Sequence, residues 1–469
     1  MSNISGRRLN RLAAICCSMS LLLGASNAMA QQIAAAIDSK TGSGTAAAAN
    51  TKTAAPRSEP SMEEMLSIIK RLEDRVRELE AKAAPIAAPA VDSAKPAAMT
   101  TAVAPVEAKA VKIQDGKKEE EEKKANEGIL GFFRATEITG FVDAYYGYNF
   151  NRPTIDTQLR NFDTKHNQFS LNMAEIALEK KPTPDNRLGY RMDLDFGPAT
   201  DIVHSFEPGG LGTFRNLEQG YLSYLAPAGK GLQIDVGKFV TQHGAEVIET
   251  KDNWNYSRSL LFALAIPYYH FGVRATYPVD DKLSLSGYVV NGWNNVVDNN
   301  HRKTYGAQAV IKPNSKFTFV QNYMGGPEQT GNDKDWRHLS DSLATYTVNS
   351  KVSLMANYDY GFDRFAGARV HWQGFAGYAK FQVNKWYAFS PRVEWYDDHD
   401  GFTTGLAQKV KDITLTSEQK IGGGLITRLE YRRDFSDKHF FTKGSDLLVK
   451  AQTTLAFGLV YAFSSKSDQ

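Results

Sequence analysis

Serine and histidine side chains gather in one stretch of this sequence, residues 240–269, and just beyond it. Ser257, Ser259 and His243 lie within the stretch, and His270 follows it. A serine activated by a histidine base is the usual nucleophile of acyl transfer. However, the chain contains no G-x-S-x-G, H-E-x-x-H or phosphate-loop motif. We therefore predict no catalytic residues, no metal and no cofactor, and a hydrolase is a less favoured alternative.

The same stretch carries charged residues that can act without catalysis: Glu246, Glu249, Lys251, Asp252 and Arg258. Charges of both signs that face a narrow, water-filled passage create a transverse field that sorts solutes. An alternative use of the stretch is a packed cover, because residues 260–267 (LLFALAIP) are apolar. The secondary-structure elements on either side of the stretch decide between the charged passage and the packed cover.

The chain of 469 residues begins with a secretory signal. Arg7, Arg8 and Arg11 precede an apolar run, residues 12–25, and Ala28-Met29-Ala30 forms an A-x-A cleavage site. Cleavage after Ala30 removes the only two cysteines, Cys16 and Cys17, and with them any disulfide or thiol chemistry. No later apolar run is long enough for a spanning helix. Any membrane span must therefore consist of strands.

After a low-complexity segment, residues 31–60, the pattern over residues 61–82 predicts a coiled coil. Apolar residues recur at three-four spacing, and two charged residues flank them at g and e positions. The predicted oligomer is a trimer, and the alternative is a solitary amphipathic helix. The predicted oligomerisation residues are Met62, Met65, Ile69, Leu72, Arg75, Val76, Leu79 and Glu80.

Residues 83–136 form a linker that is rich in Ala and Pro and ends in charged residues, including KKEEEEKK at 117–124. We predict that this linker and the coiled coil together form a periplasmic arm. An arm of this kind could bind peptidoglycan.

From residue 137 onward, apolar and polar residues alternate with the period of a β-strand. In LGYRMDLDF, residues 188–196, every second residue is apolar and the others include three charges. We predict about sixteen such strands. Short turns alternate with longer connections near residues 150–168, 197–216, 240–267, 292–302, 325–337, 361–367, 397–407 and 435–447. A soluble sandwich has no reason for this regularity, whereas an outer-membrane barrel places short turns at one end and long loops at the other.

The predicted fold is therefore all-β: a transmembrane, antiparallel, up-and-down barrel over residues 137–469, preceded by a short α-helical coiled coil. Residues 169–180 change phase near Ala174, which indicates either a β-bulge or a wrong boundary. The last strand, which alternates from Leu455 to Phe463, resembles the signal read by the barrel-assembly machinery. The residues predicted to line the lumen are Arg191, Asp193, Asp195, Asp235, Arg274, Asp359, Arg369, Arg392, Glu394, Arg428, Glu430 and Arg432.

Three long strings carry a family resemblance: residues 138–153 (ITGFVDAYYGYNFNRP), residues 237–279 and residues 287–300 (GYVVNGWNNVVDNN). They resemble the OmpL-like β-barrel porin family of Gram-negative bacteria. The resemblance implies an outer-membrane, water-filled diffusion channel without catalysis. By analogy with general porins, the loop over residues 240–269 becomes the candidate constriction.

Two other functions remain open beside the channel. The barrel could act mainly as an envelope tether through its periplasmic arm, or it could be a barrel hydrolase. The expected partners are outer-membrane lipid, the assembly machinery and two further copies of the chain. A formal net charge of +3 gives no support for nucleic-acid binding. Because the predicted lumen charges balance, the sequence does not predict which ion is preferred.

Overall fold

The computed structural model describes residues 135–207, 211–365 and 367–466. The predicted signal peptide, low-complexity segment and coiled coil, and the predicted linker up to residue 134, lie outside the described residues. Within them, no helix has the length and apolar character needed to cross a membrane.

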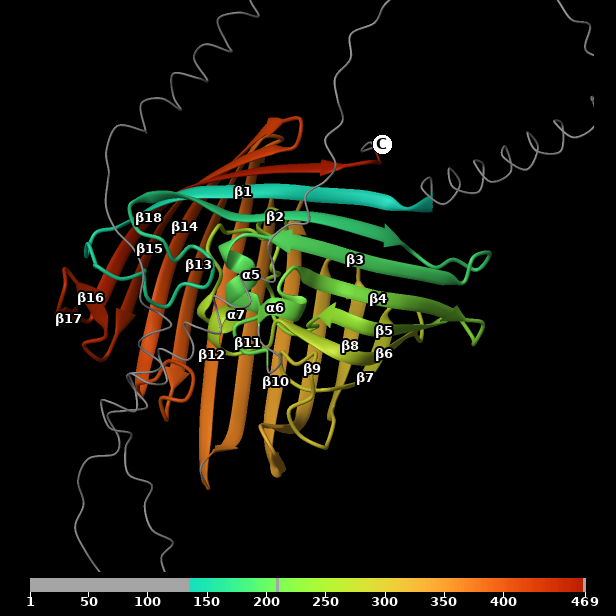
Figure 1. Cartoon of the computed structure of the whole chain (residues 1–469). Coiled ribbons are helices and arrows are strands. Elements are labelled where there is room, and N and C mark those ends of the chain that lie inside the picture. Colours follow the sequence, from blue (N-terminus) through green and yellow to red (C-terminus); the bar gives the residue numbers. More distant parts are fainter. Residues whose placement is uncertain (1–134, 208–210, 366, 467–469) are drawn as a thin grey trace, which may run out of the picture. The chain divides into compact units, whose positions relative to one another are not determined.

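Sixteen strands close into one antiparallel barrel, as the alternation predicted (Figure 1). Strands adjacent in the chain are neighbours in the sheet, and β1 closes the ring by pairing with the last strand, β18. The first eight are β1 (Glu137–Asn149), β2 (Gln168–Lys180), β3 (Leu188–Phe196), β4 (Leu217–Ala226), β5 (Leu232–Val240), β6 (Tyr269–Pro278), β7 (Leu283–Val290) and β8 (Thr304–Asn314). The others are β9 (Phe317–Gln329), β10 (Asn332–Asn349), β11 (Val352–Phe365), β12 (Ala368–Asn384), β13 (Tyr387–Asp398), β14 (Gln408–Gly422), β15 (Leu425–Ser436) and β18 (Ala451–Ser464).

The two faces of the wall differ as expected for a barrel in lipid. On β15, Leu429 and Tyr431 are exposed on the outside, whereas Arg428, Glu430 and Arg432 are buried on the inside. Large apolar side chains stay exposed around the outer face on many other strands. An apolar outer band with a polar interior is the reverse of a soluble core. The charged face of residues 188–196 therefore looks into the barrel and their apolar face looks out.

Two irregularities on neighbouring strands change which side chains reach the interior. Asp143 of β1 pairs with Met173 of β2, and the next residue of β1, Ala144, pairs with Leu171. Asn172 of β2 therefore has no partner on β1. This bulge explains the predicted phase change. On β4, Asp193 pairs with Gln219 and Leu194 pairs with Leu217, which leaves Glu218 as an extra residue. Bulges of this kind redirect side chains, and Glu218 is fully buried.

The connections alternate in length, with two exceptions. The predicted loops near 325–337 and 361–367 are mostly strand, because β9 ends at Gln329 and β11 ends at Phe365, and only two residues separate each from the next strand. The sequence GGPEQ (325–329) looks like a turn, yet its residues continue the ladder with β10. The other long connections contain further short elements: α5 (Pro198–Val203), α6 (Leu211–Phe214), η1 (Thr250–Asp252), α7 (Leu260–Leu264) and the hairpin β16 (Phe441–Lys443) and β17 (Leu447–Val449).

Candidate functional site

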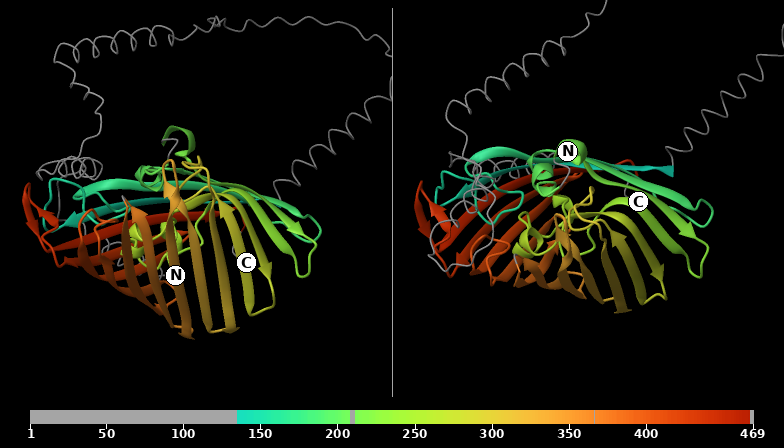
Figure 2. Two further views of the ribbon diagram at one scale, coloured as in Figure 1. Left: turned by 90° about the horizontal axis from the view of Figure 1, so that it is seen from below. Right: turned by 60° about the horizontal axis from the view of Figure 1, so that its bottom comes forward.

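The connection between β5 and β6, residues 241–268, is called here the inner loop. It contains η1 and α7, and the ring of strands surrounds it in Figures 1 and 2. Its backbone binds inward-facing side chains of distant strands. The N–H of Gly244 donates to Asp341 on β10 (2.9 Å), and the N–H of Leu260 donates to Glu394 on β13 (2.6 Å). The inner loop therefore crosses the barrel interior, and its role as a constriction stays a prediction.

Three buried arginines of the wall hold the inner loop by its carbonyl groups. Arg428 donates to the carbonyl oxygens of Thr250 (2.6 Å) and Asn253 (2.6 Å). Arg432 donates to Arg258 O (2.7 Å), and Arg392 donates to Ser257 O (2.7 Å). A guanidinium group carries five donors in a rigid fork and stays charged. These arginines thus serve as anchors for the loop.

Acidic side chains of β13, β14 and β15 balance the arginines. Arg428 pairs with Glu418 (2.7 Å) and Arg392 pairs with Glu394 (2.8 Å). Arg432 contacts both Asp412 and Asp434 at 2.8 Å. Glu430 accepts the N–H groups of Tyr256 (2.7 Å) and Ser257 (3.0 Å). A network with both partners present avoids the high cost of an isolated buried charge.

Tyr256 fastens the inner loop to the first strand. Its hydroxyl donates to Asp143 of β1 at 2.8 Å, and Asp143 also accepts from Thr250 (2.6 Å) and Asn172 (2.7 Å). A Cβ added to Gly458 on β18 would lie 2.3 Å from the Tyr256 ring. Only glycine leaves room for the ring at this point of the wall.

The apolar residues of the inner loop form a small core inside the mouth of the barrel. Ser259 caps α7 by accepting the N–H of Phe262 (3.1 Å). Phe262 packs against Phe162 from the β1–β2 connection, and Trp372 of β12 donates to Ala265 O at 3.2 Å. The apolar segment therefore packs within the barrel. The constriction, and the alternative that the loop covers the trimer interface or the barrel mouth with this segment as its packed anchor, both stay predictions.

The charged residues predicted for the constriction have different surroundings. Glu246 accepts the N–H of Ser259 (2.6 Å) and pairs with Arg392 (3.0 Å). Arg258 donates to Val247 O (2.9 Å) and Tyr256 O (2.7 Å) within its own loop. Both are buried and hold the loop in place. Lys251 and Asp252 form an ion pair with each other and reach solvent, with 22% and 56% of their side chains exposed.

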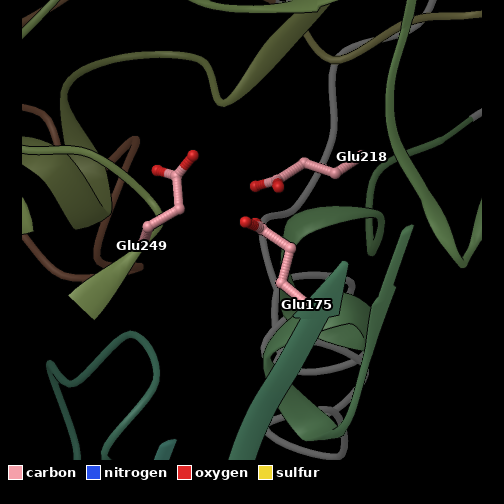
Figure 3. A group of neighbouring side chains, drawn as sticks. All are labelled: Glu175, Glu218 and Glu249. Atoms are coloured by element: carbon pink, nitrogen blue, oxygen red, sulfur yellow. The ribbon is translucent and has the colours of Figure 1, made fainter. Parts of the chain in front are cut away.

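Glu249, the remaining predicted residue of the loop, meets two glutamates of the wall. Its carboxylate lies beside those of Glu175 on β2 and Glu218 on β4 (Figure 3). Neither wall glutamate was predicted from the sequence. Glu175 lies beyond the β2 bulge and Glu218 is itself the extra residue of the β4 bulge, so simple alternation assigned neither to the interior.

The other predicted lumen residues lie mainly in pairs on the inner face. Asp193 contacts Arg191 at 2.9 Å, and Asp235 contacts Arg274 at 2.8 Å. The two arginine side chains are partly open to solvent, whereas both aspartates are buried. Asp195 and Asp359 are also fully buried.

Arg369 does not face the lumen, and that prediction is wrong. On β12 the residues Trp372, Gly374 and Ala376 point inward, so odd-numbered positions point outward. Arg369 is exposed, and its guanidinium stacks on Phe362 at 4.3 Å. The strand is regular here, and the prediction placed Arg369 on the wrong face of it.

The two serines and two histidines singled out in the sequence bind other partners in the structure. Ser257 Oγ accepts from Arg392 (3.1 Å), and Ser259 caps α7. His243 and His270 both contact the hydroxyl of Thr241, at 3.2 and 3.1 Å. Burial lowers the pKa of the His243 imidazole to about 4, although Asp341 acts in the opposite direction. Among the described residues, neither of these serines has a hydrogen bond to a histidine.

Comparisons with known proteins agree with the barrel. A family model described as "Putative beta-barrel porin-2, OmpL-like" matches residues 135–463. No curated protein matches the chain.

Several solved structures are similar to this chain at low identity. The anion-selective porin from Comamonas acidovorans is 11% identical, with a TM-score of 0.49 over 70% of this chain and 99% of that one. The outer membrane channel DcaP of Acinetobacter baumannii is 11% identical, with a TM-score of 0.48 over 70% and 97%. Salmonella typhi OmpF, solved with daunomycin, is 13% identical, with a TM-score of 0.46 over 70% and 97%.

Proposed function

Because this chain belongs to the OmpL-like beta-barrel porin-2 family, we propose that it is a channel for the passive diffusion of small hydrophilic solutes across the bacterial outer membrane. The proposal includes no catalytic step. It rests chiefly on the inner loop, which crosses a sixteen-stranded barrel and keeps an ion pair in contact with solvent.

The charged residues form two groups, one that holds the inner loop and one that reaches solvent, and this separation supports a channel. Arg392, Arg428 and Arg432 hold one side of the inner loop to β13 and β15. Solvent reaches the charged side chains of Lys251 and Asp252 on the loop and of Arg191 and Arg274 on β3 and β6. A passage lined by these groups carries both signs of charge. Such a passage admits small polar solutes and discriminates among ions by the field at its narrowest part.

The proposed assembly is a homotrimer on its periplasmic coiled coil. The apolar outer face meets lipid, and the heptads of residues 61–82 join the three chains. Wall arginines, loop and barrel all belong to one chain, so that each copy would hold its own passage.

The test is single-channel conductance of the purified full chain in a planar bilayer, with the reversal potential measured across a salt gradient. We expect discrete conductance steps, in groups of three for a trimer. The sign of the reversal potential would give the selectivity. A folded, heat-modifiable barrel that shows no conductance would contradict the proposal and would favour the tether.

A further inference from the structure

Three glutamates from separate parts of the chain converge inside the barrel. Glu175 comes from β2, Glu218 from the bulge of β4 and Glu249 from the inner loop, just before η1. One carboxylate oxygen of each lies within 4.8 Å of those of the other two. Figure 3 shows the three side chains pointing toward one another. Their residues are only 3%, 0% and 8% exposed, respectively.

The carboxylates lack the partners that buried charges require. Both oxygens of Glu218 and one oxygen of Glu175 are buried without any hydrogen-bond partner. The side chain of Glu218 is fully buried and points into the cluster. An unpaired buried carboxylate is strongly destabilising, because it has lost its hydration and gained no partner. Glu218 therefore needs either a proton or a cation between the carboxylates to balance its charge.

The neighbouring cations are engaged elsewhere. Lys251 pairs with Asp252, and Arg191 pairs with Asp193. Lys238 donates to the carbonyl oxygen of Leu217 and contacts His204. Within the described part of the chain, no ion pair reaches any of the three glutamates. The compensating charge must therefore come from solution.

We infer that Glu175, Glu218 and Glu249 bind one divalent cation, and that Ca²⁺ fits best. Ca²⁺ takes only oxygen ligands, at about 2.3–2.6 Å, in a flexible geometry that water can complete. Two ligands on opposite sides of the ion then lie roughly 4.8 Å apart. The spacing of the three carboxylates falls within this limit. Mg²⁺ demands shorter bonds and nearly ideal octahedral geometry, and Zn²⁺ sites usually include nitrogen or sulfur ligands.

The bound ion joins the inner loop to a part of the wall that the arginines do not reach. Glu175 and Glu218 belong to β2 and β4, whereas the arginine anchors belong to β13 and β15. The ion contacts the loop immediately before the solvent-exposed pair Lys251 and Asp252, whose position it would stabilise. The cation site goes beyond the proposed channel function, and its binding test remains valid if the barrel does not conduct.

The experiment is equilibrium dialysis of ⁴⁵Ca²⁺ against the full chain, refolded in detergent so that no Ca²⁺-binding lipopolysaccharide is present, and freed of metal with a chelator. We expect saturable binding of one ion per chain at pH 8. The variant Glu218→Gln should bind at least about tenfold more weakly, because it removes one charged ligand. The control Glu179→Gln changes another glutamate on β2, which lies near Lys181, and it should bind like the wild type.

A second measurement distinguishes loss of Ca²⁺ binding from a folding defect. Ca²⁺ should raise the temperature at which the wild type and Glu179→Gln lose their compact form on gels, but should leave Glu218→Gln unchanged. If Glu218→Gln does not fold, Glu249→Gln replaces it, since Glu249 lies outside the strands. Absence of saturable binding at about 1 mM Ca²⁺, or equal binding by wild type and both cluster variants, would overturn the inference.

Discussion

The carboxylate of Glu246 and the guanidinium of Arg392 lie 3.0 Å apart, although 146 residues separate them in the chain. One belongs to the inner loop and the other to β13. Both are buried, and Arg392 also contacts Glu394 and Asp412. This pair represents the central feature of the molecule: charges of the wall fix the loop inside the barrel.

Replacing Arg392 by alanine should release the inner loop. The change removes the positive charge that faces the carboxylates of Glu246, Glu394 and Asp412. Removal of one partner of a buried ion pair typically lowers the free energy of unfolding by about 3–5 kcal/mol. We expect a lower temperature of heat modification and a single-channel conductance changed by about twofold.

Arg369→Ala is the matched control for that experiment. Arg369 is exposed on the outer face, so its removal should change the free energy of unfolding by no more than about 0.5 kcal/mol. An Arg392→Ala barrel with the wild-type conductance would show that the arginine does not position the loop.

Replacing Asp252 by asparagine should shift ion selectivity toward anions. Asp252 is the most exposed of the loop charges predicted for the constriction, and its removal leaves Lys251 without its partner. We expect the anion-to-cation permeability ratio, measured from reversal potentials, to rise by about twofold. Asp281→Asn, in the exposed turn between β6 and β7, should have no such effect. An unchanged ratio in Asp252→Asn would place the narrowest part of the passage elsewhere.

The stability of the barrel should depend on His243 under acidic conditions. Burial lowers its pKa from 6.5 to about 4 in the folded protein. The unfolded chain therefore binds more protons than the folded chain between these values, and the free energy of unfolding rises with pH across that window. The contribution is complete above about pH 6.5 and declines as the pH falls toward 4.

Urea unfolding at several pH values, followed by tryptophan fluorescence, measures this dependence. His243→Gln should flatten the slope between pH 4 and 6.5, whereas His301→Gln, at an exposed site, should preserve it. Equal slopes in all three proteins would mean that His243 titrates normally in the fold.

Deleting residues 61–82 should weaken the proposed trimer and leave the barrel intact. The predicted heptads lie in this segment, and coiled-coil association depends on their buried a and d positions. Gentle gel electrophoresis should show monomers that remain heat-modifiable. Deletion of residues 31–60 is the control, and a trimer that survives the loss of 61–82 would show that the barrels associate through their outer faces.

Much of the fold and only part of the site could be predicted from the sequence. Alternation of side chains has a period of two in any strand, and it located all sixteen barrel strands, together with the buried charges Arg428, Glu430 and Arg432 on one face. It failed where one extra residue shifts the phase, so that Glu175 and Glu218 were not predicted. It also gave no sign that strand continues through Gly325, Gly326 and Pro327.

The sequence by itself determined that this chain builds a barrel with an apolar outside and a charged inside, because that information is local and repeats along every strand. Only the tertiary structure decided what the charges do. Arg392 meets Glu246, and Glu249 meets Glu175 and Glu218, because closure of the barrel brings distant strands around one loop. These contacts depend on the sheet register and the bulges of the whole barrel, and no single stretch of sequence encodes them.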